Sequence, residues 1–211
     1  MRPNQANKRD AILELSLGVF VKNGYVGTST DQLAAAASVS KQTLYKEFGD
    51  KEGVFAALIE FACDRVDDPF APLVERMKEA ASAEEAVGLI AEQFTRSIMN
   101  PQVQQLRRLV IAEAGRFPHL GQLYWERGFL RVIGSISRCL DTLHDRRLLD
   151  VADSTLAAHH FAGMMLWIPS NQTMFAGGSY PVTEAELTRI IETGAAAFLR
   201  AYGHCAQGGD R

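Results

Sequence analysis

The chain has 211 residues, of which 47% are hydrophobic and 22% are charged, and its formal net charge at pH 7 is -3. This length and composition allow a core large enough to fold without metals or disulfides. No run of roughly 18 apolar residues predicts a membrane span, and the polar N-terminus lacks the apolar core of a secretory signal, so we expect a cytoplasmic protein.

The charge is unevenly distributed along the chain. Residues 1–51 contain seven Lys or Arg and five Asp or Glu, a net charge of +2, which leaves -5 for the remainder. This asymmetry favours attraction of nucleic acid to the N-terminal part. The three cysteines, Cys63, Cys139 and Cys205, are odd in number and widely spaced. They predict reduced thiols and no zinc or redox site.

The first predicted helix carries apolar residues at helical spacing, namely Ile12, Leu15, Val19 and Phe20. It should end at Asn23-Gly24, because glycine suits the left-handed residue that closes many helices. A short, alanine-rich helix should follow, since Ser29 and Gln32 are spaced as a capping box.

A third short helix is predicted after the break at Val39. Ser40 can cap the segment KQTLYKEF, which makes two turns with Leu44 and Phe48 directed inward. Asp50 can cap a fourth helix that ends near Val66. We therefore predict a first domain at residues 1–66.

Prolines near residue 70 separate this domain from a second one at residues 67–211. Capping residues, prolines and apolar spacing predict helices over about 82–99, 101–117, 118–143, 156–168 and 184–202. Residues 154–183 contain no Asp, Glu, Lys or Arg, so this stretch should lie in the core or at a subunit interface. With no strand alternation in the sequence, the predicted fold class is all-α.

Two short helices joined by a tight turn, with polar residues on the second, are typical of a helix-turn-helix DNA-binding motif. Lys41 could bind guanine acceptors, Gln42 could pair with adenine, and Thr43 could touch a thymine methyl group. Six further residues suit phosphate contacts: Thr28, Ser29, Thr30, Tyr45, Lys46 and Lys51. Double-stranded DNA is the predicted partner.

The segment FVKNGYVGTSTDQLAAAASVSKQTLYKEFGDKEGVF closely resembles the DNA-binding domain of the tetracycline-repressor (TetR) family. The shared features are Gly24-Tyr25, Thr28-Ser29, Leu33-Ala34, Ala37 through Ser40, Thr43-Leu44-Tyr45, Phe48 and Lys51-Glu52. Two positions depart from the family pattern. Ser38 stands where the family usually has the turn glycine, and Glu47 stands where histidine or tyrosine is common, which puts a phosphate contact there in doubt.

The segment QLRRLVIAEAGRFPHLGQLYWERG is similar to the C-terminal region of a TetR subgroup with a helical regulatory domain. The resemblance implies that the last two long helices form a four-helix dimer interface and that the earlier ones enclose a ligand cavity. The predicted interface residues are His159, Phe161, Leu187, Ile191, Gly194 and Phe198. The candidate ligand-lining residues are Phe94, Leu106, Val110, Trp125, Phe129, Met164 and Trp167, and such aromatic and methionine stripes fit plain core equally well.

Taken together, the sequence predicts a homodimeric repressor that binds a palindromic operator and is released by a small hydrophobic molecule. The alternative is an interaction protein without ligand control, whose core would be dry. No catalytic motif supports an enzyme, and no cofactor is expected. His159 and His160 point in different directions on a helix and lack nearby ligands, so a metal site is not predicted.

Overall fold

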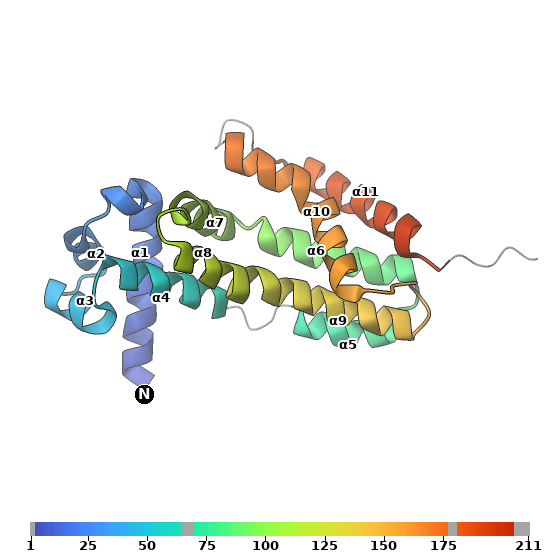
Figure 1. The fold of residues 1–211 in the computed structure, drawn as a ribbon, viewed down its shortest axis with the longest axis horizontal. Helices are drawn as coiled ribbons and strands as arrows, with labels where there is room; N and C mark the ends of the chain where they lie inside the picture. The colour runs from blue at the N-terminus through green and yellow to red at the C-terminus, as the bar shows by residue number, and fades with distance from the viewer. Residues whose placement is uncertain (1–2, 65–69, 177–180, 205–211) are drawn as a thin grey trace, which may run out of the picture. The chain divides into compact units, whose positions relative to one another are not determined.

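The computed structural model describes residues 3–64, 70–176 and 181–204. Within these ranges the chain is helical, apart from turns, loops and one isolated bridge between Leu149 and Gly203. The elements in chain order are α1 Pro3–Gly27, α2 Thr30–Ala36, α3 Lys41–Phe48, α4 Lys51–Asp64, α5 Ala71–Glu79, α6 Ala83–Ile98, α7 Pro101–Glu113, α8 Pro118–Tyr124, the π-helix η1 Trp125–Leu130, α9 Arg131–Asp145, α10 Ser154–Ala176 and α11 Glu184–Tyr202 (Figure 1). The predicted all-α fold is confirmed.

The chain divides into two compact units. The first comprises Met1–Val66 and Gln105–Phe129, and the second comprises Asp67–Gln104 and Leu130–Arg211. The segment Gln105–Phe129 packs with the first unit, where α8 contacts α4.

The core of the first unit is built around three aromatic rings. Phe20 lies 5.2 Å from Phe55 and 5.9 Å from Tyr25, measured between ring centroids. On α1 the buried face is shifted from the predicted one, because Leu15 is half exposed while Ser16 is buried. The Ser16 hydroxyl donates to the Ile12 carbonyl at 2.7 Å, which satisfies this buried polar group within the helix.

The predicted interruption at Gly24 is a single residue with φ 68° inside α1. This positive φ favours glycine, since a side chain at such a backbone position is strained. After Gly24 the chain makes one more turn to Gly27 before α2 begins.

The second unit consists of packed helices in which α10 contacts both α9 and α11, and α11 contacts α6. Helix α11 has the predicted bounds. Its capping box pairs Thr183 with Glu186, and these hydrogen bonds lower the pKa of the Glu186 carboxyl. Helix α10 continues through Pro169 to Ala176, beyond the predicted end at Ile168.

The helical run from Pro118 to Asp145 contains a π-helical turn that apolar spacing did not predict. Ile133, Ile136 and Leu140 are buried on α9 as expected, whereas Trp125 in η1 is 48% exposed. A π-helix holds more residues in each turn than an α-helix, so the α-helical spacing used for the prediction does not apply across η1. Trp125 instead stacks on Phe129, with ring centroids 4.4 Å apart.

Candidate nucleic-acid interface and regulatory region

Helices α2 and α3 are joined by a four-residue turn, Ala37–Ser40. The Ser38 amide donates to the Ala35 carbonyl at 3.1 Å and the Val39 amide to the Ala34 carbonyl at 3.0 Å, which close the turn. Ser38 has φ 53°. The left-handed position that the TetR resemblance assigns to glycine is therefore present, with serine occupying it.

We expect the change Ser38→Gly to stabilise the protein. A residue other than glycine in the left-handed region costs about 1–2 kcal/mol, and Ser38→Gly removes this cost. Part of the stabilisation is lost again because glycine makes the unfolded chain more flexible. The free energy of unfolding should rise by about 0.5–1 kcal/mol in urea titrations. The matched change Ser40→Gly, at φ -71°, should lower it because a helix cap is lost. A less stable Ser38→Gly variant would contradict this account.

The predicted caps of α2 and α3 are confirmed. The Ser29 hydroxyl accepts from the Gln32 amide at 3.2 Å, and the Gln32 side chain accepts from the Ser29 amide at 2.8 Å. The Ser40 hydroxyl accepts from the Thr43 amide at 3.1 Å and lies 2.8 Å from the Thr43 hydroxyl. These bonds fix where α2 and α3 begin, so the first turn of α3 has a defined position on the head.

Helix α3 is anchored by one side and open on the other. Leu44 is fully buried, while Lys41, Gln42, Tyr45 and Lys46 are exposed. The Tyr45 hydroxyl lies 3.4 Å from the Thr30 hydroxyl of α2, a long contact between the two helices. A short polar helix presented in this way can enter a major groove.

Two predicted phosphate contacts are engaged inside the head. Thr28 is buried, and its hydroxyl donates to the Gly24 carbonyl at 2.7 Å. The Lys51 ammonium donates to the carbonyls of Tyr25 and Thr28 at 2.8 Å each and lies 4.5 Å from the Tyr25 ring centroid. These groups hold the end of α1 against the start of α4, which leaves at most one Lys51 N–H for a phosphate.

One charged pair on this surface was not predicted. The Lys41 ammonium lies 2.9 Å from a carboxylate oxygen of Asp31, in the first turn of α2. The hydrogen bond to Asp31 raises the pKa of Lys41. Ten residues separate the partners, so only the turn between the helices brings them together.

The candidate ligand-lining residues are divided between the two units. In the first, Leu106 and Val110 belong to the buried core, and Trp125 and Phe129 form the stacked pair described above. In the second, Phe94 is buried and lies 5.9 Å from Phe161 between ring centroids.

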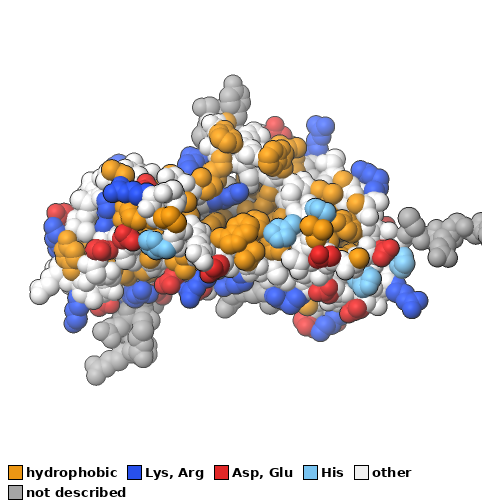
Figure 2. Space-filling view, in the orientation of Figure 1, with side chains coloured by type: hydrophobic (Ala, Val, Ile, Leu, Met, Phe, Trp, Pro, Cys, Tyr) orange, Lys and Arg blue, Asp and Glu red, His pale blue; other side chains and the backbone are white. Residues whose placement is uncertain are grey.

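The remaining two candidates, Met164 and Trp167, lie on α10 and are 37% and 74% exposed. They belong to a larger set of exposed residues at helical spacing. This set, here called the α10 stripe, consists of Leu156, His160, Met164, Trp167, Ile168 and Phe175. Figure 2 shows hydrophobic side chains exposed along this helix.

Most of the predicted dimer-interface residues are covered by their own subunit. Leu187, Ile191, Gly194, Phe161 and Phe198 are all buried in the second unit, and His159 is half-buried. Phe198 packs edge-on against Phe161 at 5.1 Å and stacks on Tyr202 at 4.6 Å. Their burial therefore needs no second chain, and among the described residues of α10 the large apolar side chains of the α10 stripe remain exposed.

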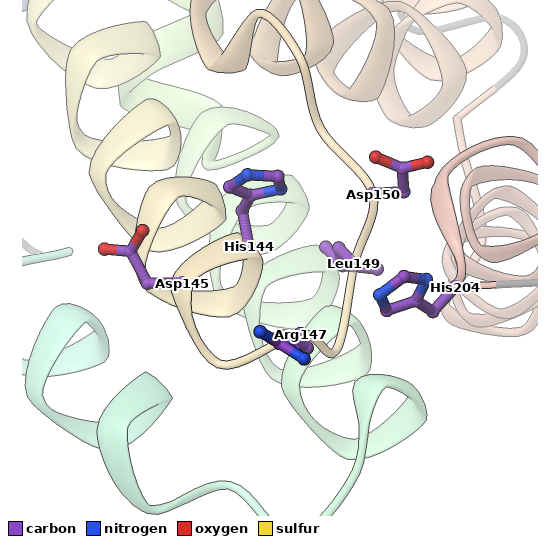
Figure 3. Close-up of a pocket in the computed structure, with 6 residues that line it drawn as sticks. All are labelled: His144, Asp145, Arg147, Leu149, Asp150 and His204. Atoms are coloured by element: carbon purple, nitrogen blue, oxygen red, sulfur yellow. The ribbon is translucent and has the colours of Figure 1, made fainter.

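The second unit has a surface pocket of about 470 Å³ at the end of α9 (Figure 3). Its lining residues are His144, Asp145, Arg147, Leu149, Asp150 and His204. The lining is mainly polar and contains none of the candidate ligand residues. Among the residues that the structure describes, no cluster of His, Cys, Asp or Glu could hold a metal ion, and no helix is long and apolar enough to cross a membrane. Cys63 and Cys139 are buried, and Cys205 lies outside the described residues.

Comparison with protein families gives matches over both units. A model described as the C-terminal domain of AefR-like transcriptional repressors matches residues 85–204. A model described as bacterial regulatory proteins of the tetR family matches residues 12–58. The first match covers more than half of the chain, and the second contains the α2–α3 motif.

Individual relatives agree with these matches. The uncharacterized HTH-type transcriptional regulator YezE of Bacillus subtilis is 23% identical over 149 residues, which are 70% of this chain and 75% of YezE. The HTH-type transcriptional repressor ComR of Escherichia coli is 40% identical over 57 residues, which are 27% of each chain.

Two solved structures are similar over nearly the whole chain. A protein described as a TetR-family transcriptional regulator from Mesorhizobium loti is 36% identical, with a TM-score of 0.89, covering 96% of this chain and 100% of that one. The flavonoid-responsive regulator FrrA is 28% identical, with a TM-score of 0.72, covering 95% and 100%.

Proposed function

Since the chain belongs to the TetR family of transcriptional regulators, which are not enzymes, we propose that it is a repressor that binds a palindromic operator as a homodimer and is released by a small hydrophobic molecule. The observation that carries the DNA-binding part is the capped α3 helix, which is anchored by buried Leu44 and exposes Lys41, Gln42 and Tyr45. Paired recognition helices in a dimer would sit about one DNA turn apart, roughly 34–36 Å.

The contacts to DNA are assigned by what each side chain has available. Lys41, Gln42 and Thr43 occupy the first turn of α3 and are proposed to reach base edges. Ser29, Thr30, Tyr45 and Lys46 are proposed to contact phosphates and so to position the head. Thr28 and Lys51 are proposed to act mainly by shaping this surface, because their polar groups bind backbone carbonyls.

Dimerisation is proposed to use the α10 stripe. An exposed, regularly spaced set of large apolar side chains on one helix is typical of a protein interface. The stripe lies within the charge-free stretch 154–183, so no Lys, Arg, Asp or Glu of that stretch would be buried by pairing. The Nδ1 atom of His160 lies 2.5 Å from the Tyr202 hydroxyl of the same chain. His160 would keep this hydrogen bond when the interface forms.

Ligand control is proposed to act on the population of two conformations of the dimer. A ligand that binds the conformation with poorly matched head spacing more tightly would release the operator. FrrA, 28% identical over 95% of the chain, is described as flavonoid-responsive. Flavonoids are therefore the first compounds to test, with Trp125 and Phe129 as candidate stacking partners.

The proposed function is tested by selecting bound sequences from a random duplex pool and titrating the selected duplex at several salt concentrations. A palindromic sequence with a steep salt dependence is expected, because each lysine or arginine bound to phosphate releases counterions. No enrichment at any salt concentration would reject the proposal. Once the operator is identified, titrating the protein–operator complex with flavonoids and other hydrophobic compounds tests whether a ligand releases the protein from DNA.

We expect Gln42→Ala to reduce operator affinity without affecting dimerisation. If the amide makes a bidentate contact with adenine, its loss should cost about 1–3 kcal/mol, and selectivity should relax at one base pair in each half-site. Gel-shift titrations against operator variants measure both effects. The control is Gln32→Ala on α2, which removes a cap partner of Ser29 and should leave base preference unchanged. Unaltered affinity and base preference in Gln42→Ala would place the reading residues elsewhere.

A further inference from the structure

The charge pair between α2 and α3 lies on the surface proposed to face DNA. The Lys41 ammonium is 2.9 Å from Oδ1 and 3.1 Å from Oδ2 of Asp31, and the two side chains are 47% and 72% exposed. Ion pairs with this much exposure add little to folding stability, because solvent screens them. Asp31 also lies in the first turn of α2, where a carboxylate favours the helix dipole by roughly 0.3–1 kcal/mol, but that contribution does not require Lys41 as a partner.

The pair restricts what Lys41 can do. An ammonium group has three N–H donors, and the two Asp31 oxygens can occupy two of them. The third remains for one further acceptor. Lys41 is the first residue of α3, and the N-terminal residues of a recognition helix are those that contact base edges.

We propose that Asp31 is a specificity-determining residue, which keeps Lys41 from binding phosphate and leaves it one donor for a guanine. This inference rests on the proposed operator binding. Non-specific complexes depend on lysine and arginine contacts to phosphate, each of which releases about 0.9 counterion. Because the Asp31 carboxylate lies 2.9 Å from the Lys41 ammonium, the two groups together present no net positive charge to a phosphate, and the carboxylate repels the backbone. The guanine O6 and N7 acceptors carry no net charge and remain accessible to the free N–H.

The test compares wild type with Asp31→Asn on two duplexes, the selected operator and a duplex of unrelated sequence. We expect Asp31→Asn to bind the unrelated duplex roughly fivefold more tightly at physiological salt, with a salt slope steeper by about 0.9, because Lys41 becomes available to phosphate. Operator affinity should rise less or fall. The ratio of the two affinities should therefore drop severalfold.

Two further variants separate this role from a general effect of charge. Glu47→Gln removes the same charge from an exposed position on α3 and should leave the affinity ratio within about twofold. In a Lys41→Gln background, Asp31→Asn should no longer steepen the salt slope on the unrelated duplex. An unchanged ratio in Asp31→Asn, an equal drop in Glu47→Gln, or an effect that persists without Lys41 would each overturn the proposal.

These outcomes differ from a failure of the proposed function. If the wild-type protein selects no operator, the repressor assignment fails and no affinity ratio exists. If it selects one that Asp31→Asn binds with the same selectivity, only the role of Asp31 is rejected.

Discussion

Replacing Phe198 by aspartate should unfold the second unit and should not give folded monomers. The ring is fully buried and packs against Phe161 and Tyr202 of the same chain. Removing a buried phenylalanine side chain costs about 3–5 kcal/mol, and a carboxylate without a partner in the core adds several more. The total is comparable with the whole stability of a typical domain, which is about 5–15 kcal/mol.

Circular dichroism and urea titration measure this effect directly. We expect Phe198→Asp to lose helix signal at low urea or to accumulate in the insoluble fraction. The conservative change Phe198→Leu should retain the fold with a reduced free energy of unfolding. A Phe198→Asp protein that is folded and monomeric would show that this residue pairs two subunits, as the sequence suggested, and that the burial within one subunit is misleading.

Helix caps, helix ends and the break at Gly24 depend on residues that are close in sequence, and these features could be predicted from the sequence. Ser29 and Gln32 have the spacing of a capping box, and Ser40 directly precedes a helical segment. Both caps were therefore predicted, the first with its correct partner, whereas the Thr43 partner of Ser40 came from the structure. The bounds of α11 followed from helical spacing, and the structure adds a capping box at Thr183 that was not predicted. The glycine break at residue 24 was also recognisable, since few other residues accept its backbone conformation.

The faces of helices were harder to predict than their ends. Helix α10 is apolar on nearly all sides, so periodicity could not distinguish the side that packs on α9 and α11 from the side that carries the α10 stripe. The family resemblance predicts Met164 and Trp167 as ligand-lining residues, and both are exposed on α10. On α1, a buried serine that bonds to its own helix concealed the inward face.

Contacts that depend on a turn or on an unusual helix were not visible in the sequence. The pair of Asp31 and Lys41 requires the conformation of residues 37–40. Trp125 lies in the π-helical turn η1, which the sequence did not predict. Lys51 resembled a phosphate-binding lysine because its two backbone acceptors, on Tyr25 and Thr28, lie more than twenty residues away in the chain.

Replacing Trp167 by aspartate should have the opposite result to Phe198→Asp, namely a folded subunit that no longer dimerises. Trp167 is 74% exposed in the single chain, so the subunit loses little packing when the indole is removed. A charge in the centre of an apolar interface would be desolvated without a partner, which opposes pairing. Sedimentation velocity should show monomers with wild-type helix content. Because two linked heads gain roughly 100- to 10,000-fold in affinity over one, operator binding should fall by at least about 100-fold.

The matched control is Ile111→Asp, which places the same charge at an exposed apolar residue of α7, outside the α10 stripe. We expect it to remain dimeric, which would attribute the effect of Trp167→Asp to the stripe and not to surface charge in general. A second change on the stripe, Ile168→Asp, should reproduce the monomer because it lies next to Trp167 and is 57% exposed. If both stripe variants sediment as dimers and bind the operator normally, the subunits must pair through another surface, and the exposed face of α10 would have to serve a different partner.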